Sequence, residues 1–166
     1  FNITKVDSVF YTHAHSDHTN GIDDLRTLFL KNNRNKIPCY GSAEAMKEIT
    51  NRFAFIYTKS KHYTIILTAH PFDDEQYGKL MRFKDIKFTP FIMDHGSCNT
   101  IGYRFGDLTY CTDMWRLDDA ALKCILGSKI LIIDGGGYHN SDNPAHADLE
   151  TIYKYNETIG AEEVYI

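Results

Sequence analysis

The sequence has no apolar run that approaches the roughly 20 residues needed to span a bilayer. Its first five residues, FNITK, also lack the charged and then apolar layout of a signal peptide. Basic residues are not in excess, because 18 Lys and Arg stand against 22 Asp and Glu, a formal net charge of −4. A mildly acidic chain has no general attraction to phosphate backbones. We therefore expect neither a membrane partner nor a long nucleic acid.

Cysteine is scarce, and the four cysteines show neither close paired spacing nor the setting of a short secreted chain. A chain of 166 residues can bury about two-thirds of its unfolded surface, so it needs no disulfides to hold a core. Reduced thiols are typical of a cytoplasmic location, which we predict here. Linkers, internal repeats and low-complexity segments are absent as well, and we expect one domain over residues 1–166.

Apolar residues instead recur from end to end, in two alternating kinds of pattern. Short β-branched and aromatic runs predict strands at 7–12, 37–40, 79–83, 86–93, 100–105, 108–112, 130–134 and 163–166. Apolar residues at helical spacing predict helices at 21–30, 118–125 and 148–159, and one that Ser42 caps and that reaches about Phe53. Strands interleaved with helices indicate a mixed α/β fold, a sheet covered by helices. Segment 54–78 mixes aromatic and charged residues. It could form either a lid or a homodimer contact, and the sequence does not decide between them.

Histidine is the residue that the sequence has in excess, with eight in the chain. Three imidazoles and a carboxylate fall within six positions, directly after the first predicted strand: His13, His15, Asp17 and His18. Imidazole nitrogen and carboxylate oxygen are suitable ligands for Zn²⁺ or Mn²⁺. A polar surface loop is the alternative, but a residue as rare as histidine seldom clusters in this way by chance. We predict a metal site on this loop.

Two further candidates, His95 and Asp113, also come where a predicted strand ends in a polar turn. Taken alone, His95 could be a hydrogen-bonded loop histidine and Asp113 a turn or helix-cap residue. Their order after the first cluster favours ligands, and a carboxylate between two cations can bridge both, which is the role that we assign to Asp113. Asp94 is either an acceptor for an imidazole N–H or an exposed turn acid.

The motif Thr-His-Ala-His-Ser-Asp-His at residues 12–18, followed by His95 and Asp113, resembles the ordered metal-ligand signature of metallo-β-lactamase-fold hydrolases. Its continuation to Arg26 is similar to the small phosphodiesterase branch that includes the cyclic phosphoribosyl phosphodiesterases. Residues 142–148 resemble the Pro-x-His segment of that branch, whose histidine acts beside the metals. This resemblance makes His146 a catalytic candidate, with a plain helix-start histidine as the alternative.

The resemblance implies an αββα sandwich with two divalent metal ions, Zn or Mn. It implies that His13, His15 and His95 hold one metal, that Asp17 and His18 hold the other, and that Asp17, Asp113 and His146 are the catalytic residues. A hydroxide that bridges the metals would attack phosphorus in a small phosphodiester, of the cyclic phosphate or nucleotide type. His146 would then protonate the departing oxygen. Hydrolysis of a thioester or carboxylic ester, or an inactive metal-binding domain, are the alternatives.

Two features of the family are missing from the sequence. Family members have opening strands before the position of Phe1 and a last metal histidine just beyond a strand like 163–166, so the sequence looks truncated at both ends. The metal on Asp17 and His18 would lack that last histidine, which we expect to weaken this position by about 10- to 100-fold. The three-histidine position should therefore be the better occupied of the two.

Overall fold

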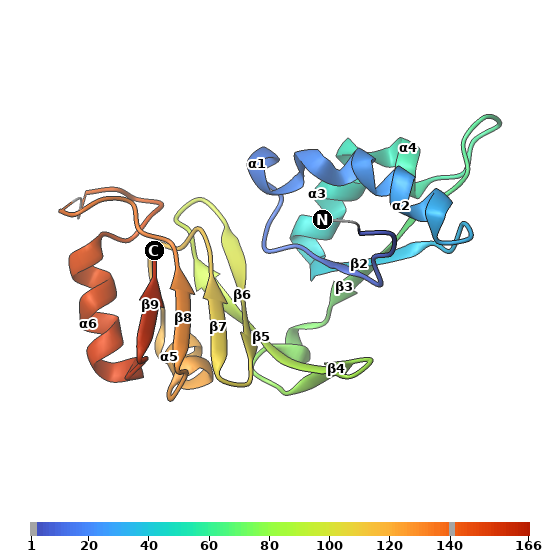
Figure 1. The fold of residues 1–166 in the computed structure, drawn as a ribbon. Coiled ribbons are helices and arrows are strands. Elements are labelled where there is room, and N and C mark those ends of the chain that lie inside the picture. The colour runs from blue at the N-terminus through green and yellow to red at the C-terminus, as the bar shows by residue number, and fades with distance from the viewer. Residues whose placement is uncertain (1–2, 140–141) are drawn as a thin grey trace. The chain divides into compact units, whose positions relative to one another are not determined.

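The computed structural model describes residues 3–139 and 142–166, and the chain divides after Asp73 into two compact units (Figure 1). Each unit has its own β-sheet and its own hydrophobic core. The prediction of a mixed α/β fold is confirmed. Within the described ranges, every helix is too short or too polar to cross a membrane.

The first unit contains a three-stranded parallel sheet in the order β1-β2-β3. Its strands are β1 (Val9–Phe10), β2 (Ile37–Ser42) and β3 (Leu67–Phe72), and its helices are α1 (Ser16–Thr19), a 3-10 helix (Asn20–Asp24), α2 (Leu25–Lys31), α3 (Ala43–Arg52) and α4 (Ala54–Tyr57). Parallel strands require crossover connections, and these helices supply them. Alternate residues of β2, such as Ile37 and Cys39, are buried in the core beneath the helices.

Three sequence expectations in this unit have a clear outcome. Ser42 caps α3 as predicted, because its Oγ accepts a hydrogen bond from the backbone N–H of Ala45 at 3.0 Å. The helix expected over 21–30 begins as a 3-10 helix instead, because Asn, Gly and Asp are weak α-helix formers and dominate residues 20–24. Segment 54–78 is largely built into the unit, since it contains α4 and β3. Strand β3 was not predicted, because it contains Pro71, and proline lacks the N–H that a strand donates. The strand lies at the edge of the described sheet, where proline is tolerated.

The second unit contains a six-stranded sheet in the order β4-β5-β6-β7-β8-β9. The elements are β4 (Met81–Phe83), β5 (Ile86–Asp94), β6 (Asn99–Phe105), β7 (Leu108–Cys111), α5 (Asp119–Ile125), β8 (Ile130–Ile133), α6 (Leu149–Ile159) and β9 (Glu163–Tyr165), after a short 3-10 helix at Asp74–Gln76. Strands β4 to β7 are antiparallel, and β7, β8 and β9 are parallel. The predicted helices α5 and α6 begin at the caps Asp118 and Asp148.

This topology brings several strand ends to one edge of the second sheet. Strand β5 is antiparallel to β6, and β6 is antiparallel to β7, so β5 and β7 run in the same direction. Strand β8 is parallel to β7. The carboxyl ends of β5, β7 and β8 therefore lie at the same edge, and the residues that directly follow them are close in space although they are far apart in sequence.

Candidate metal centre

The first set of candidate ligands lies on the loop between β1 and α1. The ring centroid of His13 is 4.4 Å from that of His15 and 4.4 Å from that of His18. A ring nitrogen of His13 lies within 4.8 Å of one of His15, which is close enough for both to bind the same ion. Asp17 Oδ2 is 3.4 Å from His18 Nε2. His13 is buried, whereas the side chain of Asp17 is 76% exposed, so the loop presents its donors from the core outward.

Backbone carbonyls within this loop are anchored by neighbouring side chains. The Arg52 guanidinium, at the end of α3, donates from Nη1 to the carbonyl oxygen of Ala14 at 2.7 Å. The Thr19 hydroxyl donates to the carbonyl oxygen of His15 at 2.9 Å. Ala14 lies between His13 and His15, so the hydrogen bond from Arg52 restrains the backbone that carries both rings. The local sequence thus shapes the loop from α3 and from α1.

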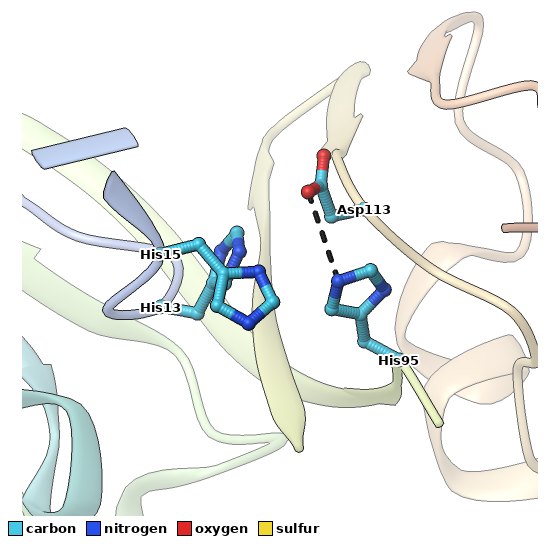
Figure 2. Close-up of side chains that lie close together, drawn as sticks. All are labelled: His13, His15, His95 and Asp113. Atoms are coloured by element: carbon cyan, nitrogen blue, oxygen red, sulfur yellow. Dashed lines mark ion pairs between the residues drawn. The ribbon is translucent and has the colours of Figure 1, made fainter. Parts of the chain in front are cut away.

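The second set lies at the common edge of β5, β7 and β8. Nε2 of His95, which follows β5, is 3.8 Å from Oδ2 of Asp113, which follows β7 (Figure 2). His95 is 3% exposed and Asp113 15%. Nδ1 of His95 is 2.7 Å from the carbonyl oxygen of Ala145. A carbonyl can only accept, so Nδ1 carries a proton, and Nε2 is the ring nitrogen that faces Asp113 and is placed to bind a metal.

Asp94 does not take the role of imidazole acceptor that the sequence left open. Its Oδ1 accepts a hydrogen bond from the backbone N–H of Gly96 at 2.8 Å, and so it closes the turn after β5. The backbone of Asp94 also pairs with that of Arg116, which ties the segment after Asp113 to the end of β5. The acceptor for His95 is a main-chain carbonyl, and a sequence pattern cannot reveal such a partner.

Sequence reasoning missed one residue of this set, Asp134. Its Oδ2 lies 2.5 Å from Nδ1 of His146, and one ligand atom from each of Asp113, Asp134 and His146 falls within 4.8 Å of the others. The His146 ring also meets the His95 ring edge-on, with centroids 5.0 Å apart. The apolar pattern places Asp134 at the end of the strand predicted at 130–134. The available signal was that a carboxylate directly follows β8, as Asp113 comes soon after β7.

The chemistry of both sets fits divalent cations. In the second set, the carboxylates of Asp113 and Asp134 are largely buried and lie close together, and like charges so placed repel each other unless a cation offsets them. His95 adds an imidazole nitrogen, Nε2, to these oxygens. The first set offers three imidazoles and the Asp17 carboxylate. Nitrogen and oxygen donors of this kind suit Zn²⁺ and Mn²⁺.

Comparison with known families identifies the superfamily of the chain. Residues 2–166 match the model of the beta-lactamase superfamily domain. The chain belongs to this superfamily. The resemblance predicted from residues 12–18, His95 and Asp113 is therefore confirmed, together with the metallo-β-lactamase fold.

Solved structures extend the likeness over nearly all of the chain. A diphosphatase from the PhnP family matches with a TM-score of 0.81 and 26% identity, over 98% of this chain and 61% of that protein. The metallo-beta-lactamase fold protein YhfI from Bacillus subtilis has a TM-score of 0.71 at 16% identity, over 96% and 62% of the two chains. Yeast PDE1 has a TM-score of 0.69 at 12% identity, over 93% and 52%. The last two likenesses concern the fold alone.

A curated relative carries a different description. An octanoyltransferase of Porphyromonas gingivalis is 26% identical over 166 residues, which cover 95% of this chain and 30% of the relative. The chain therefore spans about a third of the length of the curated relative and about three-fifths of the PhnP-family diphosphatase. The shared family identifies the fold, and the substrate is a matter for proposal.

Proposed function

We propose that this chain belongs to a metal-dependent hydrolase that cleaves small phosphodiesters, of the cyclic phosphate or nucleotide type. The observation that carries the proposal is the cluster of Asp113, Asp134 and His146 beside His95. In this cluster two carboxylates, suited to binding a cation, lie beside His146, and Asp134 is hydrogen-bonded to that histidine. The likeness to a PhnP-family diphosphatase, at 26% identity, favours phosphorus over carbon as the reacting centre.

We further propose that the two ligand sets serve one centre with two divalent ions, Zn or Mn. In this proposal His13, His15 and His95 hold one ion, Asp17 and His18 hold the other, and Asp113 lies between them. Neither set by itself has enough donor atoms to coordinate two ions, and this supports the proposal that both sets contribute to the same centre. When bound, such ions lower the pKa of a water molecule and offset charge on phosphoryl oxygens.

The remaining chemistry belongs to side chains of the second unit. A carboxylate only accepts hydrogen bonds, so Nδ1 of His146 carries the proton that Asp134 Oδ2 accepts. Asp134 thereby orients the ring, and Nε2 of His146 is left to donate a proton to the departing oxygen of the substrate. Asp134 is a positioning residue in this scheme, and His146 is the general acid.

A substrate panel on the full-length protein tests the proposal. We expect bis(p-nitrophenyl) phosphate to be hydrolysed after loading with Mn²⁺ or Zn²⁺, and the activity to be lost on chelation and restored on re-addition of the ion. Thr109→Val provides a matched control, because this buried threonine of β7 bonds to Ser128, in the turn before β8, and is not one of the proposed ligands. Stoichiometric metal binding with no turnover of any phosphodiester would contradict the assignment.

Hydrolysis of a thioester or carboxylic ester is the second candidate function. The octanoyltransferase relative favours it, because that protein handles an acyl group. The same activated water can attack a carbonyl carbon as well as phosphorus. Turnover of octanoyl thioesters without turnover of phosphodiesters would establish this candidate in place of the first. Failure of both classes would leave a metal-binding domain without activity.

Location and assembly stay predictions. The four free cysteines fit the reducing cytoplasm that we propose. Segment 54–78 exposes the aromatic side chains of Phe55 and Tyr63, and we keep it as the candidate homodimer contact. Light scattering on the full-length protein, compared with a Phe55→Ser, Tyr63→Ser variant, checks this: a dimer that the variant loses would support the contact.

A further inference from the structure

The backbone of Asp113 has a conformation that side chains seldom adopt. Its φ is +47°, in the left-handed region, where a non-glycine residue is disfavoured even though aspartate tolerates it better than most. The strand β7 has already ended at Cys111, so the sheet ladder does not hold Asp113 in place. A second interaction is therefore needed to keep the residue in this conformation.

Thr100, on β6, supplies that interaction. Its hydroxyl donates a hydrogen bond to the carbonyl oxygen of Asp113 at 3.0 Å, and no part of Thr100 is exposed to solvent. Thr100 lies in the middle of the sheet, in register with Met93 of β5, so its position is set by two strands. A fully buried hydroxyl on a strand of the sheet thus holds the main chain of Asp113.

The carboxylate of the same residue is oriented by separate contacts. The Thr112 hydroxyl donates to Asp113 Oδ1 at 3.1 Å, and Oδ2 lies 3.8 Å from Nε2 of His95. These contacts depend on where the Cα–Cβ bond points, which the backbone conformation determines. If φ of Asp113 relaxed to a negative value, the carboxylate would leave both partners.

We propose that Thr100 is a positioning residue of the metal centre, whose hydroxyl holds Asp113 in its left-handed conformation and so aims the carboxylate at the cations. This inference rests on the proposed function only in so far as Asp113 is a metal ligand, and it does not depend on the substrate. It predicts that removal of the Thr100 hydroxyl lowers the affinity for metal, whereas removal of another buried hydroxyl in the same unit lowers only the stability of the fold.

The test uses the full-length protein and Co²⁺ as the probe, in competition with a chromophoric chelator. Thr100→Val keeps the shape of the side chain and removes the hydroxyl, and we expect Co²⁺ to bind about 10- to 100-fold more weakly, with a changed visible spectrum of the bound ion. Thr100→Ser should restore the affinity and the spectrum. Thr109→Val is the matched control, since it removes a buried hydroxyl of β7 that bonds, at 2.6 Å, to Ser128 Oγ in the turn between α5 and β8.

The outcomes separate a positioning role from a structural one. Both valine variants should lower the melting temperature of the metal-free protein, but only Thr100→Val should alter Co²⁺ affinity and spectrum. Equal Co²⁺ affinity in the wild type and Thr100→Val, or an equal loss in Thr109→Val, would overturn the proposal. A wild-type protein that binds no Co²⁺ would overturn it too. Absence of phosphodiester turnover with intact Co²⁺ binding would count against the proposed function alone.

Discussion

The two units supply candidate ligands in opposite ways. In the first unit, three histidines and an aspartate follow one another on a single loop between β1 and α1. In the second unit, the contributing residues come from four separate segments, and only the topology of the sheet brings them together. A local set depends on the shape of one loop, whereas a dispersed set depends on the whole fold of its unit. The two sets should therefore respond differently to mutation.

The two sets also differ in what holds their side chains. Main-chain anchors, from Arg52 to Ala14 and from Thr19 to His15, hold the loop of the first set. In the second set Nδ1 of each ring meets a group that can only accept, the carbonyl of Ala145 for His95 and the carboxylate of Asp134 for His146. In the first set, Nδ1 of His13 meets the Thr12 hydroxyl at 3.1 Å, which can donate or accept. The partners of the second set therefore fix where a ring proton lies, and the Thr12 hydroxyl does not.

The largest expected effect is on turnover, at His146. His146→Ala should lower kcat by about 10²–10⁴-fold, because a positioned general acid contributes that much. Asp134→Asn should lower kcat as well, because the ring loses the carboxylate that holds Nδ1 and so orients Nε2. Metal content, measured by inductively coupled plasma mass spectrometry, should stay unchanged in His146→Ala. Loss of the metal together with activity would make His146 a ligand instead.

Removal of single ligands distinguishes the two proposed metal positions. Titration with Mn²⁺, followed by calorimetry, should show a tighter and a weaker binding event. We expect His95→Ala to weaken the tighter event and His18→Ala to weaken the weaker one, each by at least 10- to 100-fold. A His18→Ala variant that loses only the tighter event would show that we have assigned the ligands to the wrong ions.

The anchor of the first loop should have a smaller effect. Arg52→Met removes the hydrogen bond to Ala14, and we expect the free energy of unfolding to fall by about 1 kcal/mol and metal affinity to fall up to about 10-fold. Arg52→Lys should recover part of the affinity. The control is Arg26→Met, which breaks only the exposed pair with Asp23. Equal metal affinities in Arg52→Met and Arg26→Met would mean that the loop holds its own shape.

The thiols of the two cores predict a dependence of stability on pH. Burial raises the pKa of Cys39, in the first core, to about 11, and burial also raises the pKa of Cys111, in the second. An unfolded thiol titrates near 8.5, so the unfolded state loses its proton first as the pH rises. Stability should therefore be constant below about pH 8.5 and fall between there and about pH 11. Urea unfolding at pH 7.5 and pH 10 measures this loss.

Thiol modification at pH 8 checks the same burial independently. Cys98 and Cys124 are partly exposed and should react with iodoacetamide in the native protein. Cys39 and Cys111 should react only when their own unit unfolds. Peptide mapping would show whether the two buried thiols become reactive at the same urea concentration, and a difference between them would mean that the two units unfold separately.

The same contrast explains what the sequence could reveal. Strands β5 to β8, the helices at 118–125 and 148–159 and the cap Ser42 were predicted because strand patterns, helical spacing and caps are local. The first ligand set was evident for the same reason. His95 and Asp113 were candidates from their places after predicted strands, but their closeness could not be predicted, because it depends on the register of three strands. Asp134 and the carbonyl of Ala145 were missed, since neither is marked by a motif.

The central claim is that the two ligand sets hold two cations in one centre, and anomalous diffraction from Mn²⁺-loaded crystals of the full-length protein tests it most directly. We predict two anomalous peaks about 3.5–4 Å apart, with His13, His15 and His95 around one, Asp17 and His18 at the other, and Asp113 in contact with both. In protein limited to residues 1–166, the first peak should be the stronger. A filled Asp17 and His18 position beside an empty three-histidine position, or peaks that each contact only one unit, would contradict the account.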